Sequence, residues 1–235
     1  MSNDPLLQPY QLKHLTLRNR IMTTSHEPAY AEDGMPKERY RLYHAERAKG
    51  GIAMAMTAGS AAVSRDSPPA FNNILAYKDE VVPWIRELTD AIHEHGAAAM
   101  IQLTHLGRRT GWDKGDWLPP VSSTYDREPA HRYFAKMAED WDITRIIRDF
   151  ADAAERMKAG GMDGVEIMTH GHLLDQFWSP LTNRLEGPYG AESLETRMKF
   201  ALDVIAAVRE RVGDDFIVGV RFAHVDVDPP KGAAS

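Results

Sequence analysis

The chain of 235 residues contains no cysteine. That absence excludes a disulfide framework, thiolate zinc sites, iron–sulfur ligation and any cysteine nucleophile. The chain also lacks an apolar run of about 18 residues, which is the length that a membrane-spanning helix needs. Its first residues lack the basic and then apolar layout of a signal peptide. We therefore expect a cytoplasmic protein with no membrane partner.

The charge distribution gives no sign of a nucleic-acid partner. The 34 acidic and 28 basic residues give a net charge of −6 and are spread along the whole chain, so there is no basic stripe. With 43% hydrophobic and 26% charged residues, the composition is that of a folded globular protein. Small molecules are the expected partners.

Apolar runs alternate with amphipathic segments along the chain, which is typical of strand–helix units around a parallel sheet. Most of the runs are continuous rather than alternating, as expected for strands that are covered on both faces. The five predicted strands are residues 20–25, 52–58, 98–104, 164–169 and 216–222.

Helical periodicity fills the intervals between these strands. One amphipathic segment has apolar positions from Val82 to Ile92 and is followed by Gly96, a typical helix stop. Asp142 and Ser193 are the expected N-caps of two further helices. These helices are predicted to end at Gly160 and Gly213, a shorter helix covers residues 37–49, and a long loop covers residues 106–141.

The spacing of the strands leaves two architectures open. The first and fifth strands lie 196 residues apart, or 49 residues per strand–helix unit, so eight units need roughly 390 residues. A closed (β/α)₈ barrel needs eight paired strands. The chain therefore forms either an open doubly wound sheet of five strands or the first part of a barrel.

Polar residues gather where the predicted strands end. In both architectures ligands bind at the carboxyl ends of the strands and in the loops that follow. Core packing alone does not explain polar groups at five consecutive strand ends, so we predict a functional rim. The rim residues include Ser25, His26, Gly59, Gln102, His170, His172 and Arg221.

Several segments resemble one known family. They are residues 17–21, 101–108, 174–184, 189–190 and 193–197. Together they are similar to the FMN-dependent old yellow enzyme family, and most similar to its trimethylamine dehydrogenase, dienoyl-CoA reductase and N-methylproline demethylase branch. The resemblance covers essentially the whole chain.

The resemblance implies an α/β fold of the TIM (β/α)₈ barrel type. Residues 1–235 would be the N-terminal part of a single FMN-binding domain, a truncated barrel with about the first five strands. Residues 225–235 have no strand or helix pattern and are expected to be a frayed tail. The implied activity is hydride transfer between a non-covalent FMN and a small organic substrate. Either an enone or enoyl group is reduced or an N-methyl amine is oxidised and demethylated, with NADH or NADPH as a possible reductant.

The resemblance also assigns cofactor-binding residues. Gln102 would meet the pyrimidine edge of the flavin, whose donors and acceptors a primary amide can match. Arg221 would lie near the flavin N1 and O2 and stabilise negative charge there. Ser25 and His26 would pass behind the ring, and Gly59 would let the ring lie against the main chain. The alternatives are a core glutamine, an arginine paired with a rim carboxylate and a plain turn glycine.

Two histidines are the implied catalytic residues. His170 matches a histidine that orients the substrate over the flavin, and His172 stands where many relatives carry a tyrosine proton donor. An imidazole with an unshifted pKa near 6.5 can act as a general acid or base at neutral pH. Each could instead be a structural histidine at a strand end.

The chain departs from the family pattern at several points. Glu27 replaces the cysteine that bonds the flavin ring in the amine dehydrogenases, so any FMN would be non-covalent. Residues 165–176 are one residue shorter than usual, and Gly187-Pro188 disrupts the usual acidic residue before Tyr189. The phosphate-binding loops of the family belong to strands seven and eight, which are not among the five predicted strands.

Two other interpretations remain. His170 and His172, with His26, His105 and His224 near other strand ends, could form the metal site of an amidohydrolase-like barrel. Alternatively, the chain is a catalytically inactive fragment or a half-barrel that depends on a partner. In an open sheet the exposed edge strands favour association, so a homo-oligomer is possible.

Overall fold

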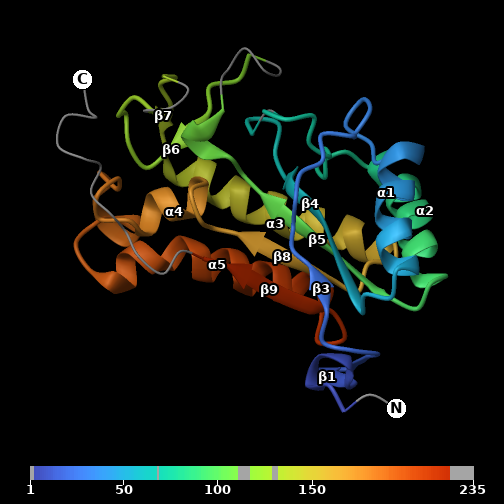
Figure 1. Cartoon of the computed structure of the whole chain (residues 1–235). Coiled ribbons are helices and arrows are strands. Elements are labelled where there is room, and N and C mark those ends of the chain that lie inside the picture. The colour runs from blue at the N-terminus through green and yellow to red at the C-terminus, as the bar shows by residue number, and fades with distance from the viewer. Residues whose placement is uncertain (1–2, 68, 111–116, 129–131, 223–235) are drawn as a thin grey trace.

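A five-stranded parallel sheet forms the centre of the computed structural model, which describes residues 3–67, 69–110, 117–128 and 132–222. Its strands pair in the order in which they occur along the chain, as predicted (Figure 1). They are β3 (Met22–Thr23), β4 (Met54–Ala62), β5 (Ala98–Thr104), β8 (Gly164–Met168) and β9 (Ile217–Arg221).

Four helices in the described ranges pack on one face of this sheet, which we call the outer face: α1 (Glu38–Lys49), α2 (Val81–His93), α3 (Asp140–Ala159) and α5 (Leu194–Val212). The short helix α4 (Leu173–Trp178) packs against α5. The apolar side chains of these helices join alternate strand residues such as Ala99, Ile101 and Val165 in the main core. A doubly wound sheet carries helices on both faces. Helices on one face of a sequentially ordered parallel sheet are instead the arrangement of a (β/α)₈ barrel, of which these are the first five strands.

The opposite, inner face has a smaller apolar cluster near the beginning of the strands. Met54, Met56, Met100 and Ile217 form it, and they contact Leu12, Leu15 and Leu17. These leucines belong to an antiparallel hairpin of β1 (Tyr10–Leu12) and β2 (Leu15–Leu17), which the sequence patterns did not predict. The hairpin covers this end of the inner face, and polar side chains occupy the other end.

The first strand is shorter than predicted. Only Met22 and Thr23 pair with β4, at Met54 and Ala55. The next amide of β4, that of Met56, donates to the Thr23 side-chain hydroxyl at 3.1 Å rather than to a main-chain carbonyl. A side chain therefore ends the ladder, and the predicted range 20–25 is wrong at both ends.

The second strand is longer than predicted and irregular. It continues to Ala62, but its register against β5 shifts between Thr57 and Ala61. Ala58 lies at this shift with a φ of 51° and its amide donates to the Tyr40 hydroxyl at 2.9 Å. A residue in the left-handed region bends the strand and breaks regular pairing.

The predicted helices are present, with one correction. Glu139 is the N-cap of α3, and Asp142 is the third helical residue, whose carboxylate accepts from the Glu139 amide at 3.0 Å. Asp142 is therefore part of a capping box rather than the cap itself. Ser193 caps α5 as predicted, and Gly96 and Gly213 have positive φ after their helices.

The sequence patterns missed several short elements. They are α4, the parallel pair β6 (Val121–Ser122) and β7 (Lys136–Met137) within the long loop, and the 3₁₀ turns Pro5–Leu7, Gly107–Arg109 and Gly187–Tyr189. The predicted tail, residues 225–235, lies outside the described residues. No helix within the described ranges is long and apolar enough to cross a membrane.

Apolar side chains are exposed on the two outer strands. Met22 on β3 is 48% exposed, Val220 on β9 is 36% exposed, and Phe222 just after β9 is 65% exposed. Among the described residues no strand pairs with the outer edge of β3 or β9. Association through these edges stays a prediction.

Candidate functional site

Four polar side chains from four segments of the chain meet on the inner face, near the carboxyl ends of the strands. Gln102 Nε2 donates to Ser25 Oγ at 2.7 Å and to Glu166 Oε1 at 2.6 Å. Ser25 Oγ lies 3.2 Å from the same Glu166 oxygen and accepts from Arg221 Nη1 at 3.1 Å. We call Ser25, Gln102, Glu166 and Arg221 the inner cluster.

The register of the sheet explains why these residues meet. Gln102 on β5 lies opposite Glu166 on β8, which in turn lies opposite Gly219 on β9. Register partners project to the same face, and residues two apart along a strand share that face. Arg221, two residues after Gly219, therefore projects inward, and Ser25 follows the short first strand. The sequence patterns predict Ser25, Gln102 and Arg221 at one rim, as observed, but do not predict Glu166 there.

The inner cluster has unused hydrogen-bonding capacity. Both protons of the Gln102 amide nitrogen are engaged, whereas no group among the described residues donates to Gln102 Oε1 or to Glu166 Oε2. Arg221 uses only Nη1 in its side-chain contacts. The cluster can therefore offer acceptors and cationic donors to a planar ligand on the inner face.

The charges of this cluster are joined through a hydroxyl group. Ser25 lies between the Arg221 guanidinium and the Glu166 carboxylate, and the two charged groups make no direct ion pair. Arg221 is exposed, whereas Gln102 is 2% exposed. A buried amide next to an accessible cation suits a ligand with a hydrogen-bonding edge and negative charge.

His172 lies beside Thr104, two residues after Gln102 on the chain, and stays neutral. Its Nδ1 is 2.5 Å from Thr104 Oγ1, at the end of β5. Burial, followed by the nearby charges of Arg109, His170 and His105, lowers the pKa of His172 to about 3. The expectation of an unshifted imidazole is wrong for this residue. Neutral His172 can donate one N–H but cannot act as an imidazolium acid near pH 7.

His170 lies beyond the end of β8 and is exposed. No described residue forms a hydrogen bond or ion pair with it, so its ring is accessible at the rim. His170 is close enough to His172 for its charge to lower the pKa of His172. The structure thus places both predicted histidines at the carboxyl end of the sheet.

Gly59 has a packing role. A Cβ atom at this position would lie 2.5 Å from the main-chain nitrogen of Glu27, so only glycine permits this approach. The segment that carries Ser25 and Glu27 is thereby held against β4. The predicted contact of Gly59 with a flavin ring stays a prediction.

Glu27 is a carboxyl group with a strongly shifted titration. Burial raises its pKa to about 7, although hydrogen bonds from Ala29, Asn73 and Gly59 act in the opposite direction. The Ala29 amide donates to Glu27 Oε1 at 3.0 Å and Asn73 Nδ2 to Oε2 at 3.4 Å. Glu27 therefore links the first-strand segment to the loop that follows β4.

His26 lies in a different place from the inner cluster. It lines a pocket of about 240 Å³ with Thr24, Tyr43, His44 and Arg47. Burial, with smaller contributions from Arg47 and His26, lowers the pKa of His44 to about 3. The structure therefore does not bring His26 together with Gln102 and Arg221 through any hydrogen bond.

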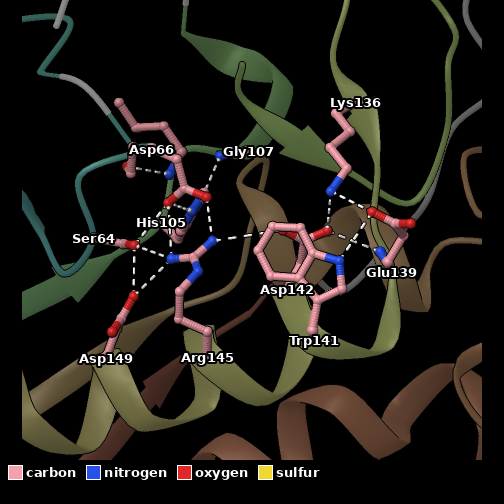
Figure 2. A network of polar contacts seen from close by, with 12 residues as sticks. Ser64, Asp66, His105, Gly107, Lys136, Glu139, Trp141, Asp142, Arg145 and Asp149 are labelled. Atoms are coloured by element: carbon pink, nitrogen blue, oxygen red, sulfur yellow. Dashed lines mark hydrogen bonds and ion pairs between the residues drawn. The ribbon is translucent and has the colours of Figure 1, made fainter. Parts of the chain in front are cut away.

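A second polar cluster lies on the outer side of the sheet, between β4 and α3 (Figure 2). Arg145 forms ion pairs with Asp66 and Asp149, and His105 Nε2 is 3.0 Å from Asp66 Oδ1. Ser64 Oγ hydrogen-bonds Asp66 at 2.7 Å and Asp149 at 2.6 Å. We call Ser64, Asp66, His105, Arg145 and Asp149 the outer cluster. It borders a cavity of about 460 Å³.

The outer cluster contains His105, which is one of the ligands proposed for the alternative metal site. In the structure His105 Nε2 lies against Asp66 Oδ1. Within the described ranges no group of three or more His, Cys, Asp or Glu side chains is placed to hold a metal ion. His224 lies outside the described residues.

The polar groups of the inner cluster lie at the carboxyl ends of a partial (β/α)₈ sheet, the rim at which barrel enzymes form their active sites. The model of the NADH:flavin oxidoreductase / NADH oxidase family matches residues 5–234, and the chain belongs to this family of oxidoreductases. The family assignment confirms the resemblance inferred from the sequence.

Curated relatives narrow the comparison. The chain is 74% identical over 222 residues to a probable N-methylproline demethylase of Rhizobium meliloti (strain 1021), covering 94% of this chain and 33% of that protein. It is 48% identical over 225 residues to a multifunctional alkene reductase/demethylase of Caballeronia cordobensis, covering 96% of this chain and 33% of the relative. The chain therefore spans about a third of the length of these relatives.

Solved structures share the fold. Morphinone reductase in complex with tetrahydroNAD has a TM-score of 0.85 and 25% identity, over 93% of this chain and 63% of that one. A 2-naphthoyl-CoA reductase complex has a TM-score of 0.84 at 24% identity, over 92% of this chain and 35% of that one. These matches confirm the expected barrel fold.

Proposed function

We propose that residues 1–235 are the N-terminal part of one FMN-binding barrel domain and that the inner cluster contacts the flavin ring. The observation that carries this proposal is the shared Ser25 contact, which joins Gln102 and Arg221 on one face. An amide acceptor and a guanidinium on one face match the hydrogen-bonding edge of an isoalloxazine ring.

Bound FMN supplies hydride transfer to or from a carbon of the substrate. Arg221 provides a fixed positive charge that stabilises negative charge developing on the ring beside it. Gln102 orients the ring edge, and Ser25 positions both side chains. With glutamate at position 27 and no cysteine among residues 1–235, this chain forms no cysteinyl bond to the flavin.

The two histidines face the substrate in this proposal. With its pKa lowered to about 3, His172 acts as a neutral hydrogen-bond donor. If the Thr104 hydroxyl donates to Nδ1, the remaining proton lies on Nε2 and can be donated to the substrate. His170, which is exposed, orients the substrate over the ring.

The favoured substrate class is an N-methylated amino acid. This choice is supported by the relatives' names: besides the probable N-methylproline demethylase, an N,N-dimethylglycine/sarcosine dehydrogenase of Chromohalobacter salexigens is 45% identical over 97% of this chain. The name of the 48% identical alkene reductase/demethylase supports alkene reduction as a second candidate. NADH or NADPH is the proposed electron donor for that second reaction.

A ring-binding titration tests the flavin assignment. Lumiflavin, which has no phosphate, is titrated into the chain while its fluorescence is followed, and FMN is titrated in parallel. Loss of one charge-assisted hydrogen bond, worth about 1.5–3 kcal/mol, weakens binding by roughly tenfold to a hundredfold. We therefore expect Arg221→Met to weaken lumiflavin binding by at least tenfold and Gln102→Leu by several-fold.

The matched control is Arg211→Met. Arg211 is also an arginine with access to solvent, but it pairs with Asp152 and Glu155 on the helices. Lumiflavin binding that does not saturate in the unaltered chain would contradict the proposal, as would equal weakening by the Arg211 and Arg221 changes.

A further inference from the structure

Glu166 is the one member of the inner cluster to which the proposed function gives no role. It lies directly opposite Gln102 in the sheet, and its Oε1 accepts from Gln102 Nε2 at 2.6 Å. The sequence GVEIM places this carboxylate in the middle of a buried strand, where charged side chains are uncommon. Its Oε1 has two partners in the inner cluster, Gln102 Nε2 and the Ser25 hydroxyl, and Gln102 is the nearer.

The contact determines which end of the Gln102 amide faces the protein. A primary amide has two donors on nitrogen and an acceptor on oxygen, whereas an ionised carboxylate only accepts. Reversing the amide would place two acceptor oxygens against each other. The other neighbour, the Ser25 hydroxyl, donates its one proton to Glu166 Oε1 and so can only accept from Gln102. Glu166 therefore selects one orientation both directly and through Ser25.

Strand β9, next to Glu166, contributes no side chain that competes with Gln102 for the carboxylate. Gly219 lies opposite Glu166 on β9 and has no side chain to compete for the carboxylate. A Cβ atom there would have the Val165 carbonyl oxygen, at 3.8 Å, as its nearest neighbour, so the space beside Glu166 is open. Arg221 passes to Ser25 rather than to Glu166, and its cation stays available for a ligand.

We infer that Glu166 is a positioning residue that holds Gln102 Nε2 against the protein and turns Gln102 Oε1 toward the ligand. The site then selects a planar ring whose edge has an N–H group beside a carbonyl group, with the N–H donating to Gln102 and the carbonyl accepting from Arg221. This inference rests on the proposed function, since it specifies which ring edge the inner cluster accepts.

Two ring compounds test the inference. Lumiflavin has this N–H, and 3-methyllumiflavin carries a methyl group in its place. We expect the unaltered chain to bind lumiflavin at least tenfold more tightly. In Glu166→Gln the partner of Gln102 can donate as well as accept, so the orientation is no longer fixed. The preference should then fall about three- to tenfold, while its steric part remains.

The control is Glu155→Gln, which removes an exposed carboxylate from α3. It should leave the lumiflavin preference unchanged. If the unaltered chain binds neither compound, the proposed flavin site fails and this inference fails with it. If the unaltered chain has the preference and Glu166→Gln keeps it in full, the flavin site stands and the role of Glu166 is refuted.

A second measurement needs no ligand. In a chain labelled with ¹⁵N-glutamine, both side-chain amide protons of Gln102 should exchange slowly with solvent, because one donates to Glu166 and the other to Ser25. Exchange of both protons as fast as in exposed glutamines would overturn the inference. If Glu166→Gln folds, its Gln102 amide protons should exchange faster than those of the unaltered chain.

Discussion

The inner and outer clusters contain similar residue types but differ in how completely their polar groups are paired. In the outer cluster Arg145 contacts two carboxylates directly, and Asp66 receives hydrogen bonds from two further side chains. In the inner cluster Arg221 and Glu166 meet only through the Ser25 hydroxyl, and no group among the described residues donates to Gln102 Oε1 or Glu166 Oε2. A closed network holds the fold together, whereas an open one can bind a ligand.

The largest expected effect comes from opening the outer cluster. Burial alone would raise the pKa of Asp66, but His105, Arg145 and Ser64 together hold it well below its usual range. Asp66→Ala leaves His105 and part of Arg145 unpaired, so it should lower the free energy of unfolding by about 3–5 kcal/mol. Urea unfolding at pH 7 measures this loss.

The matched change in the inner cluster is Glu166→Ala, which should cost about 1 kcal/mol or less because the network is already incomplete. Equal losses of stability in the two variants would contradict the difference between the closed outer cluster and the open inner cluster. The low pKa of Asp66 also gives a sign for acid: its stabilisation is present above about pH 4 and lost as the pH falls through its folded pKa.

Glu27 gives the opposite dependence on pH. Its folded pKa of about 7 lies above the ordinary value of 4.5, so the folded state keeps a proton that the unfolded state loses. Between these values stability should therefore fall as the pH rises, by up to roughly 3 kcal/mol. Glu27→Gln should remove most of this slope in unfolding curves measured from pH 5 to 8. An unchanged slope would contradict the assignment.

Gly59→Ala tests the contact beneath the first-strand segment. The added Cβ would lie 2.5 Å from the Glu27 main-chain nitrogen, so the segment must move and stability should fall by about 1–3 kcal/mol. Because Ser25 belongs to this segment, lumiflavin binding should weaken too. Gly51→Ala is the control for binding: its Cβ would meet no atom within 4 Å, and its φ of 101° strains the main chain far from Ser25, so stability falls while lumiflavin binding should stay unchanged.

The smallest expected effect concerns His172. Thr104→Val removes the hydroxyl group next to Nδ1 and should cost about 1 kcal/mol. In the unaltered chain the ring-proton NMR signal of His172 should not move between pH 5 and 8, because its pKa is lowered to about 3. A titration midpoint near pH 6.5 would show that this histidine is accessible to protons.

Much of the fold follows from local sequence patterns. Continuous apolar runs such as residues 98–104 mark strands buried on both faces, and Gly96 and Gly213 mark helix ends through their positive φ. The place of Gln102 and Arg221 at one rim also follows, because parallel strands end on the same side. Local patterns do not determine features that depend on distant partners.

The predicted ranges of the first two strands are wrong because of contacts of this kind. The first strand ends early because the Thr23 hydroxyl replaces a main-chain acceptor, and the second bends at Ala58. The place of Glu166 in the inner cluster follows from the register, which sets it opposite Gln102. Its one sequence signal is a lone carboxylate in an otherwise apolar strand. The lowered pKa of His172 depends on burial and on Arg109, which local sequence does not show.

The central claim is that the inner cluster, and not the outer one, binds a flavin ring. Backbone and side-chain NMR shifts of the assigned chain during a lumiflavin titration test it most directly. We expect saturable shifts centred on Ser25, Gln102, Glu166 and Arg221, with the signals of Asp66 and Arg145 unmoved. Shifts centred on the cavity beside Asp66, Trp141 and Arg145 would contradict it.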